Sequence, residues 1–182
     1  MKKLRNFLVL MTAIMGFVIV NVSAQNLSIG KSGQERTIEQ QIFKKLIGLP
    51  RYGVFDIINY EVRNGTVILG GKVNSLGTKR DAASVVKRIP GVVNVVNNIV
   101  ELPPSSFDDR IRRQALRTFA SNGLYQYFRE VNPEVRIIVE NGHITLEGFV
   151  SYSGDYNRLN IYANGITGVF SVKNNLVVGS PR

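Results

Sequence analysis

Val62-Arg63-Asn64-Gly65 is repeated 77 positions later as Val139-Glu140-Asn141-Gly142, in a chain of 182 residues. The alignment runs without a gap from Val62 to Val100 over residues 139–177, and 14 of these 39 positions are identical. With ordinary amino-acid usage, chance would give about two or three identities. Upstream the offset falls to 73, so the second copy has four additional residues between its first helix and its first strand. The chain is therefore a tandem repeat.

Each copy has the pattern helix, strand, strand, helix, strand. Asn64-Gly65 and Asn141-Gly142 separate runs of alternating hydrophobicity, which predicts β-hairpins with type I′ turns. Capping-box patterns at 32–35 and 105–108 open the first helices, which are expected to end near 48–50 and 122–123. A second helix, about 78–89 in the first copy, then leads to the final strands, 92–100 and 169–178. The predicted fold class is α+β, with two tandem αββαβ two-layer sandwiches.

Six glycines occupy equivalent positions in the two copies and are expected to be structural. Gly65 and Gly142, in the Asn-Gly turns, require a positive φ. Gly91 and Gly168 each precede the final strand of their module. The remaining pair falls on the buried face of the second strand, where we expect glycine to allow a helix backbone to approach the sheet. The six are Gly65, Gly71, Gly91, Gly142, Gly148 and Gly168.

The domain organisation begins with a secretory signal at residues 1–24, which has a basic start, fourteen mostly apolar residues and small residues before Gln25. A lead-in (25–36) precedes the first module (37–102), and a Pro/Ser linker (103–107) joins it to the second module (108–178), which is followed by a tail (179–182). Cleavage of the signal leaves twenty basic and thirteen acidic residues, a formal charge of +7. We expect a periplasmic protein that meets anionic surfaces and not nucleic acid.

Catalytic and metal-binding patterns are missing from the sequence. There is no cysteine, which excludes disulfides, thiolate nucleophiles and Cys-ligated zinc. His143 is the single histidine, no acidic or histidine partners cluster near it in the sequence, and no nucleophile elbow or phosphate loop occurs. We therefore expect no enzyme activity and no cofactor.

A family resemblance rests on two motifs that occur in both copies. Gly71-Lys72-Val73 is followed by Ile89-Pro90-Gly91-Val92, and Gly148-Phe149-Val150 by Ile166-Thr167-Gly168-Val169, each continuing into a final strand with paired asparagines. This pattern resembles the BON domain and covers nearly all of the chain after residue 24. The resemblance implies an αββαβ fold and an envelope module associated with membrane phospholipid, as in osmotically inducible periplasmic proteins. The chain also resembles outer-membrane proteins with two BON domains, and this resemblance implies that the first helix of the second module contacts lipid.

Basic and aromatic residues of the second module form the candidate binding site. Arginines three and four positions apart make one stripe on its first helix, with an additional arginine on the flank and aromatic residues in the extra loop. Guanidinium groups pair with phosphate, and aromatic rings favour the headgroup boundary. The predicted phospholipid-binding residues are Arg110, Arg112, Arg113, Arg117, Tyr125, Tyr127 and Phe128.

Other interpretations of these residues stay open. The charged helix face is also compatible with simple solvation, and the aromatic residues with a place in the core. A second basic patch, formed by Lys79, Arg80, Lys87 and Arg88, lies in the first module. The leading hypothesis is reversible docking on anionic phospholipid; the alternatives are a protein-interaction or stress-protective module that acts on envelope proteins without lipid, or binding to acidic glycan.

Overall fold

The computed structural model describes residues 33–129 and 131–179. The expected signal segment and most of the lead-in lie outside the described residues. No helix in the described ranges is both long and apolar enough to cross a membrane.

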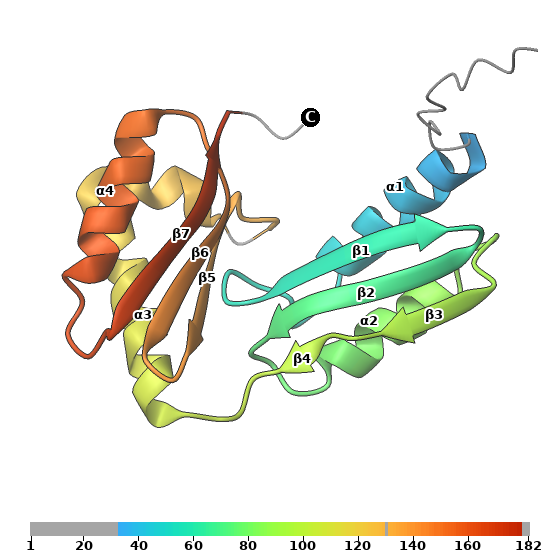
Figure 1. The fold of residues 1–182 in the computed structure, drawn as a ribbon, viewed down its shortest axis with the longest axis horizontal. Helices are drawn as coiled ribbons and strands as arrows, with labels where there is room; N and C mark the ends of the chain where they lie inside the picture. Colours follow the sequence, from blue (N-terminus) through green and yellow to red (C-terminus); the bar gives the residue numbers. More distant parts are fainter. Residues whose placement is uncertain (1–32, 130, 180–182) are drawn as a thin grey trace, which may run out of the picture. The chain divides into compact units, whose positions relative to one another are not determined.

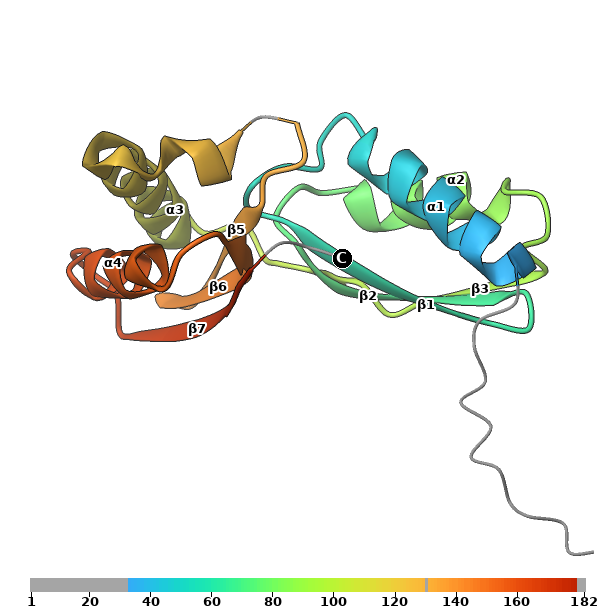
Figure 2. The ribbon, with the colours of Figure 1, turned by 90° about the horizontal axis from the view of Figure 1, so that it is seen from above.

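The first module forms one four-stranded mixed sheet with two helices on one side (Figures 1 and 2). Strand β2 is central: β1 pairs with it antiparallel, and β3 and β4 pair with it in parallel. The elements in chain order are α1 (Gly33–Ile47), β1 (Ile57–Arg63), β2 (Thr66–Val73), α2 (Thr78–Lys87), β3 (Asn94–Asn97) and β4 (Val100–Glu101).

The second module repeats this plan with a three-stranded sheet in the order β5-β6-β7, in which β7 is parallel to β6. Its additional residues form a π turn and a short 3-10 helix after the first helix. The elements are α3 (Ser106–Phe119), η1 (Ala120–Leu124), η2 (Tyr125–Phe128), β5 (Val135–Glu140), β6 (His143–Val150), α4 (Ser153–Asn164) and β7 (Ser171–Val178). The predicted tandem αββαβ fold is confirmed.

The hairpin turns have the predicted conformation, with φ of 48° and 77° at Asn64 and Gly65. In the second module an acidic residue of the first helix holds the turn: the Asp108 carboxylate accepts the backbone N–H groups of Asn141 (2.9 Å) and Gly142 (2.8 Å). This corrects half of the predicted capping box. The Ser105 hydroxyl does accept the Asp108 N–H at 3.1 Å, but the carboxylate binds the hairpin turn in place of the helix start.

Gly71 and Gly148 are structural, but for a reason different from the predicted one. Both lie at positive φ, 109° and 117°. A Cβ at Gly71 would stand 2.1 Å from the Ile57 carbonyl oxygen, and one at Gly148 would stand 2.0 Å from that of Glu134. The close neighbour is thus the backbone leading into the adjacent strand, not a helix. Glycine is required because a side chain would displace the first hairpin strand.

Candidate functional site

Helix α3 carries an exposed basic stripe. Ile111, Ala115 and Phe119 are buried against the second module's sheet, and the 3.6-residue period therefore turns Arg110, Arg113 and Arg117 outward, where all three are exposed. The sequence predicted this division of the helix correctly.

Within the part of the chain that the structure describes, no acidic side chain neutralises the stripe. Among the residues that the structure describes, Arg113 and Arg117 have no ion-pair partner. Like charges one turn apart cost a helix a few tenths of a kcal/mol. The arrangement suits an external anion, which would remove that repulsion.

Arg112 does not belong to this surface, which corrects the expectation that it adds charge to the flank. Its side chain is only 2% exposed, pairs with Asp109 at 2.6 Å and donates to the Val139 carbonyl oxygen. Both terminal nitrogens of the buried guanidinium are bonded in this way, although Nε has no partner among the described residues, and they join the helix to strand β5. Arg112 is therefore structural, because its position on the helix faces the sheet.

Two of the three predicted aromatic contacts are also buried. Tyr127 is 1% exposed, and its hydroxyl donates to Asp155 at 2.7 Å. Phe128 is 5% exposed and stacks on Phe119, with 5.4 Å between the ring centroids. Short helix η2 turns both rings into the second module's core and leaves Tyr125 at the surface, 61% exposed.

The exposed aromatic group beside the stripe is a different one, which the sequence analysis missed. Phe170 is 70% exposed and stacks on Phe107, with ring centroids 6.0 Å apart. The Arg110 guanidinium lies 5.7 Å from the centre of the Phe107 ring. This places an apolar group at the N-terminal end of the basic stripe. The repeat alignment held the clue, since the first copy has Gln34 and Val93 at these two positions.

His143 lies at the same end of the module. Its ring centroid is 5.9 Å from that of Phe170, and Nδ1 is 2.7 Å from the Ser171 hydroxyl oxygen. No group of three His, Asp or Glu side chains in residues 33–129 and 131–179 is arranged to hold a metal ion. The imidazole therefore lies beside the exposed Phe170 ring and bonds to Ser171.

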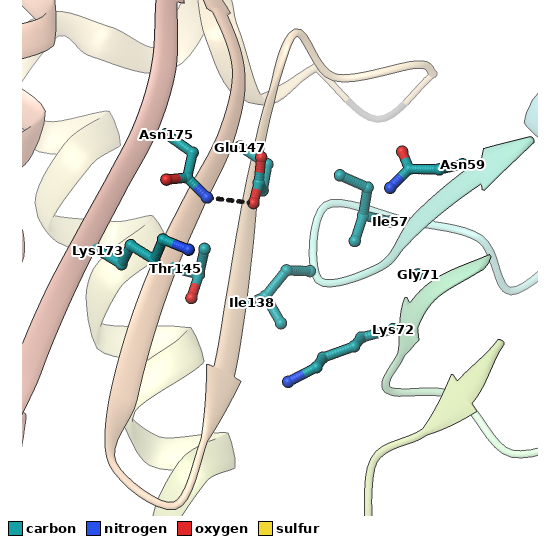
Figure 3. Close-up of a pocket in the computed structure, with 9 residues that line it drawn as sticks. All are labelled: Ile57, Asn59, Gly71, Lys72, Ile138, Thr145, Glu147, Lys173 and Asn175. Carbon is teal, nitrogen blue, oxygen red and sulfur yellow. Dashed lines mark hydrogen bonds between the residues drawn. The ribbon is translucent and has the colours of Figure 1, made fainter. Parts of the chain in front are cut away.

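A cleft of about 270 Å³ lies between the outer faces of the two sheets. Figure 3 shows Thr145, Glu147, Lys173 and Asn175 on one wall, with Lys72 pointing toward Ile138 from the other. The Asn175 amide donates to Glu147 at 2.7 Å, and Lys72 pairs with Glu140. Charges of both signs line this cleft, so it lacks the uniform positive field of the α3 stripe.

Comparison with known proteins identifies the class. The BON domain model matches residues 34–103 and again 108–180, so the chain belongs to the BON domain family, with two domains in tandem.

A curated relative is the outer membrane lipoprotein DolP of Haemophilus influenzae. It is 27% identical over 160 residues, covering 86% of this chain and 81% of the relative. A solved structure of CdsD, a structural protein of the type III secretion system of Chlamydia trachomatis, aligns at 12% identity with a TM-score of 0.32, covering 78% of this chain and 92% of that one. A TM-score of that size does not establish a common overall fold.

Proposed function

We propose that this chain is a non-enzymatic protein of the bacterial envelope that docks on anionic phospholipid through helix α3. The docking surface comprises Arg110, Arg113 and Arg117 with the Phe107–Phe170 pair, and Tyr125 lies near the helix end. The observation that carries the proposal is an exposed arginine stripe without acidic partners among the described residues, bordered by an exposed aromatic ring. The family membership and the lipoprotein relative support an envelope location.

The expected attachment is weak enough to reverse. Each basic residue close to an anionic membrane surface contributes about 1 kcal/mol, so three arginines provide about 3 kcal/mol. A partly inserted aromatic ring adds about 1–2 kcal/mol of apolar transfer. The sum corresponds to a millimolar-range interaction or slightly tighter, and it weakens with added salt.

Vesicle flotation of the chain lacking residues 1–24 tests the proposal. Binding is expected to vesicles that contain phosphatidylglycerol and not to vesicles of phosphatidylcholine alone. The double variant Arg113→Glu and Arg117→Glu removes two attractions and adds two repulsions, and should lower the partition coefficient by at least about a hundredfold at low salt.

The matched control is the double variant Lys87→Glu and Arg88→Glu, which makes the same change of net charge at the C-terminal end of helix α2. Both side chains are exposed. Equal losses from the two double variants would show that net charge, and not the α3 surface, governs binding, and the proposal would then fail.

A second candidate function is the capture of an extended polypeptide segment without lipid. Strand β7 pairs with β6 on one side and ends in Val177 and Val178, which are 53% and 49% exposed. Unpaired strand edges accept additional strands. Co-purification of an envelope protein that persists after lipid removal and in the Arg113/Arg117 variant would favour this function.

A further inference from the structure

The loop between α1 and β1, residues 51–56, is held in a fixed shape by the first module. The Asp56 carboxylate accepts the backbone N–H groups of Gly53 at 2.8 Å and of Asn74 at 2.6 Å. The Tyr52 hydroxyl oxygen accepts the Ile58 N–H at 3.2 Å. These bonds pre-order the loop, so little conformational entropy is left to lose when it makes further contacts.

This loop contacts strand β5 of the second module, within the compact unit that spans residues 31–182. The Ile137 N–H donates to the Val54 carbonyl oxygen at 2.8 Å. The Arg136 guanidinium donates to the Gly53 carbonyl oxygen at 2.7 Å and lies 4.5 Å from the centre of the Tyr52 ring. The backbone of the loop thus occupies the hydrogen-bonding edge of β5.

Side chains of the loop also join the second module's core. Val54 and Phe55 pack against the apolar cluster that contains Ile137 and Phe128, although both belong to the first module by sequence. The contact is therefore apolar as well as polar, as at a sheet edge covered within one domain.

The residues of β5 are specialised for this contact. Five of its six residues are buried, including Arg136 and Ile138 on the outer face at 7% and 4% exposure. At the corresponding positions of β1 the chain has Asn59 and Glu61, both exposed. The repeat has diverged at Arg136, where the second module meets the loop, and at Ile138 on the same face of the strand.

We propose that residues 51–56 are a structural part of the second module, capping its β5 edge so that the two modules unfold as one cooperative unit. A module of this size buries only about 60% of its unfolded surface and has little stability to spare. An uncapped β5 would expose the Ile137 N–H and the rest of its strand edge to solvent or to other chains. Burial lowers the pKa of Arg136, which is consistent with a desolvated contact.

The capped strand also positions helix α3. Arg112 of α3 donates to the Val139 carbonyl oxygen, and Asp108 binds the turn that follows β5. A loosened β5 would therefore let the N-terminal half of α3 move. If α3 is the lipid-docking helix, this movement would also lower the affinity for lipid, and that consequence rests on the proposed function.

Amide hydrogen exchange by NMR on the chain lacking residues 1–24 tests the proposal directly. The Ile137 amide, which faces outward at a sheet edge, should exchange at least about a hundredfold more slowly than an unstructured amide. Arg136→Asn, which copies the first module's residue, should speed its exchange about tenfold or more and split thermal unfolding into two transitions. The control Arg129→Asn alters an exposed arginine of the same module and should do neither.

Tyr52→Ala provides a second route if Arg136→Asn does not fold. The Tyr52 and Arg136 variants should be non-additive in a double-mutant cycle, because each removes the same contact. Fast exchange of the Ile137 amide in the unmodified chain, or independent unfolding of its two modules, would overturn the proposal. Absence of vesicle binding by the unmodified chain would refute the proposed function alone and leave the exchange result intact.

Discussion

Phe170→Ser is the sharpest test of the membrane-facing surface, because it removes the exposed ring and leaves the arginine stripe intact. A phenylalanine offers roughly 200 Å² of apolar surface, and Phe170 is 70% exposed, which leaves about 140 Å² in contact with water. At about 25 cal/mol per Å², burying half of that area in the headgroup region gains about 1.8 kcal/mol. The variant should therefore bind anionic vesicles about twentyfold more weakly.

The assay is partitioning onto phosphatidylglycerol-containing vesicles by flotation, with a thermal melt of each variant to verify folding. Val93→Ser is the matched control, since Val93 occupies the same position in the first copy and is 82% exposed. It should leave binding unchanged. Unaltered affinity of Phe170→Ser, or equal losses from both variants, would show that the Phe170 ring does not enter the bilayer.

Three further predictions concern stability and are measured by urea denaturation. Gly148→Ala should lower the free energy of unfolding by about 3 kcal/mol, because it combines strain at a positive φ with a clash against the Glu134 carbonyl; Gly154→Ala, in open space, should cost nothing. Arg112→Ala should lower it by about 2 kcal/mol, because it removes a buried side chain and leaves the Val139 carbonyl oxygen without that donor. Burial raises the pKa of Asp56, so its carboxyl group favours folding at low pH and loses that contribution as pH rises through the folded-state pKa. The stability of the native chain relative to Asp56→Asn should accordingly increase from pH 7 to pH 4.

The sequence predicted the exposed arginines of the candidate site, but it did not predict which aromatic residues are exposed. Helical spacing alone turned Arg113 and Arg117 outward, because the period of a helix fixes its faces. Tyr127 and Phe128 were assigned to the surface because they lie in a 3-10 helix of four residues, which is too short for a hydrophobic period to show which rings turn inward. Phe170 was missed, although the repeat alignment places this aromatic residue at the position of Val93, which is exposed in the first module.

Comparison of the two halves of the sequence therefore determined the duplication, and local rules determined the hairpins with left-handed Asn-Gly turns, the order of elements and the exposed arginines. The locally determined features depend on residues close in the chain, whose dihedral and periodic preferences do not depend on the remaining sequence. Only the tertiary structure decided that Arg112 is buried, that Gly71 and Gly148 face a backbone carbonyl at the start of the adjacent strand, and that residues 53 and 54 bond to β5. These features depend on which segments, 14 to 83 residues apart in the chain, meet in space, and the packing of the whole chain determines that.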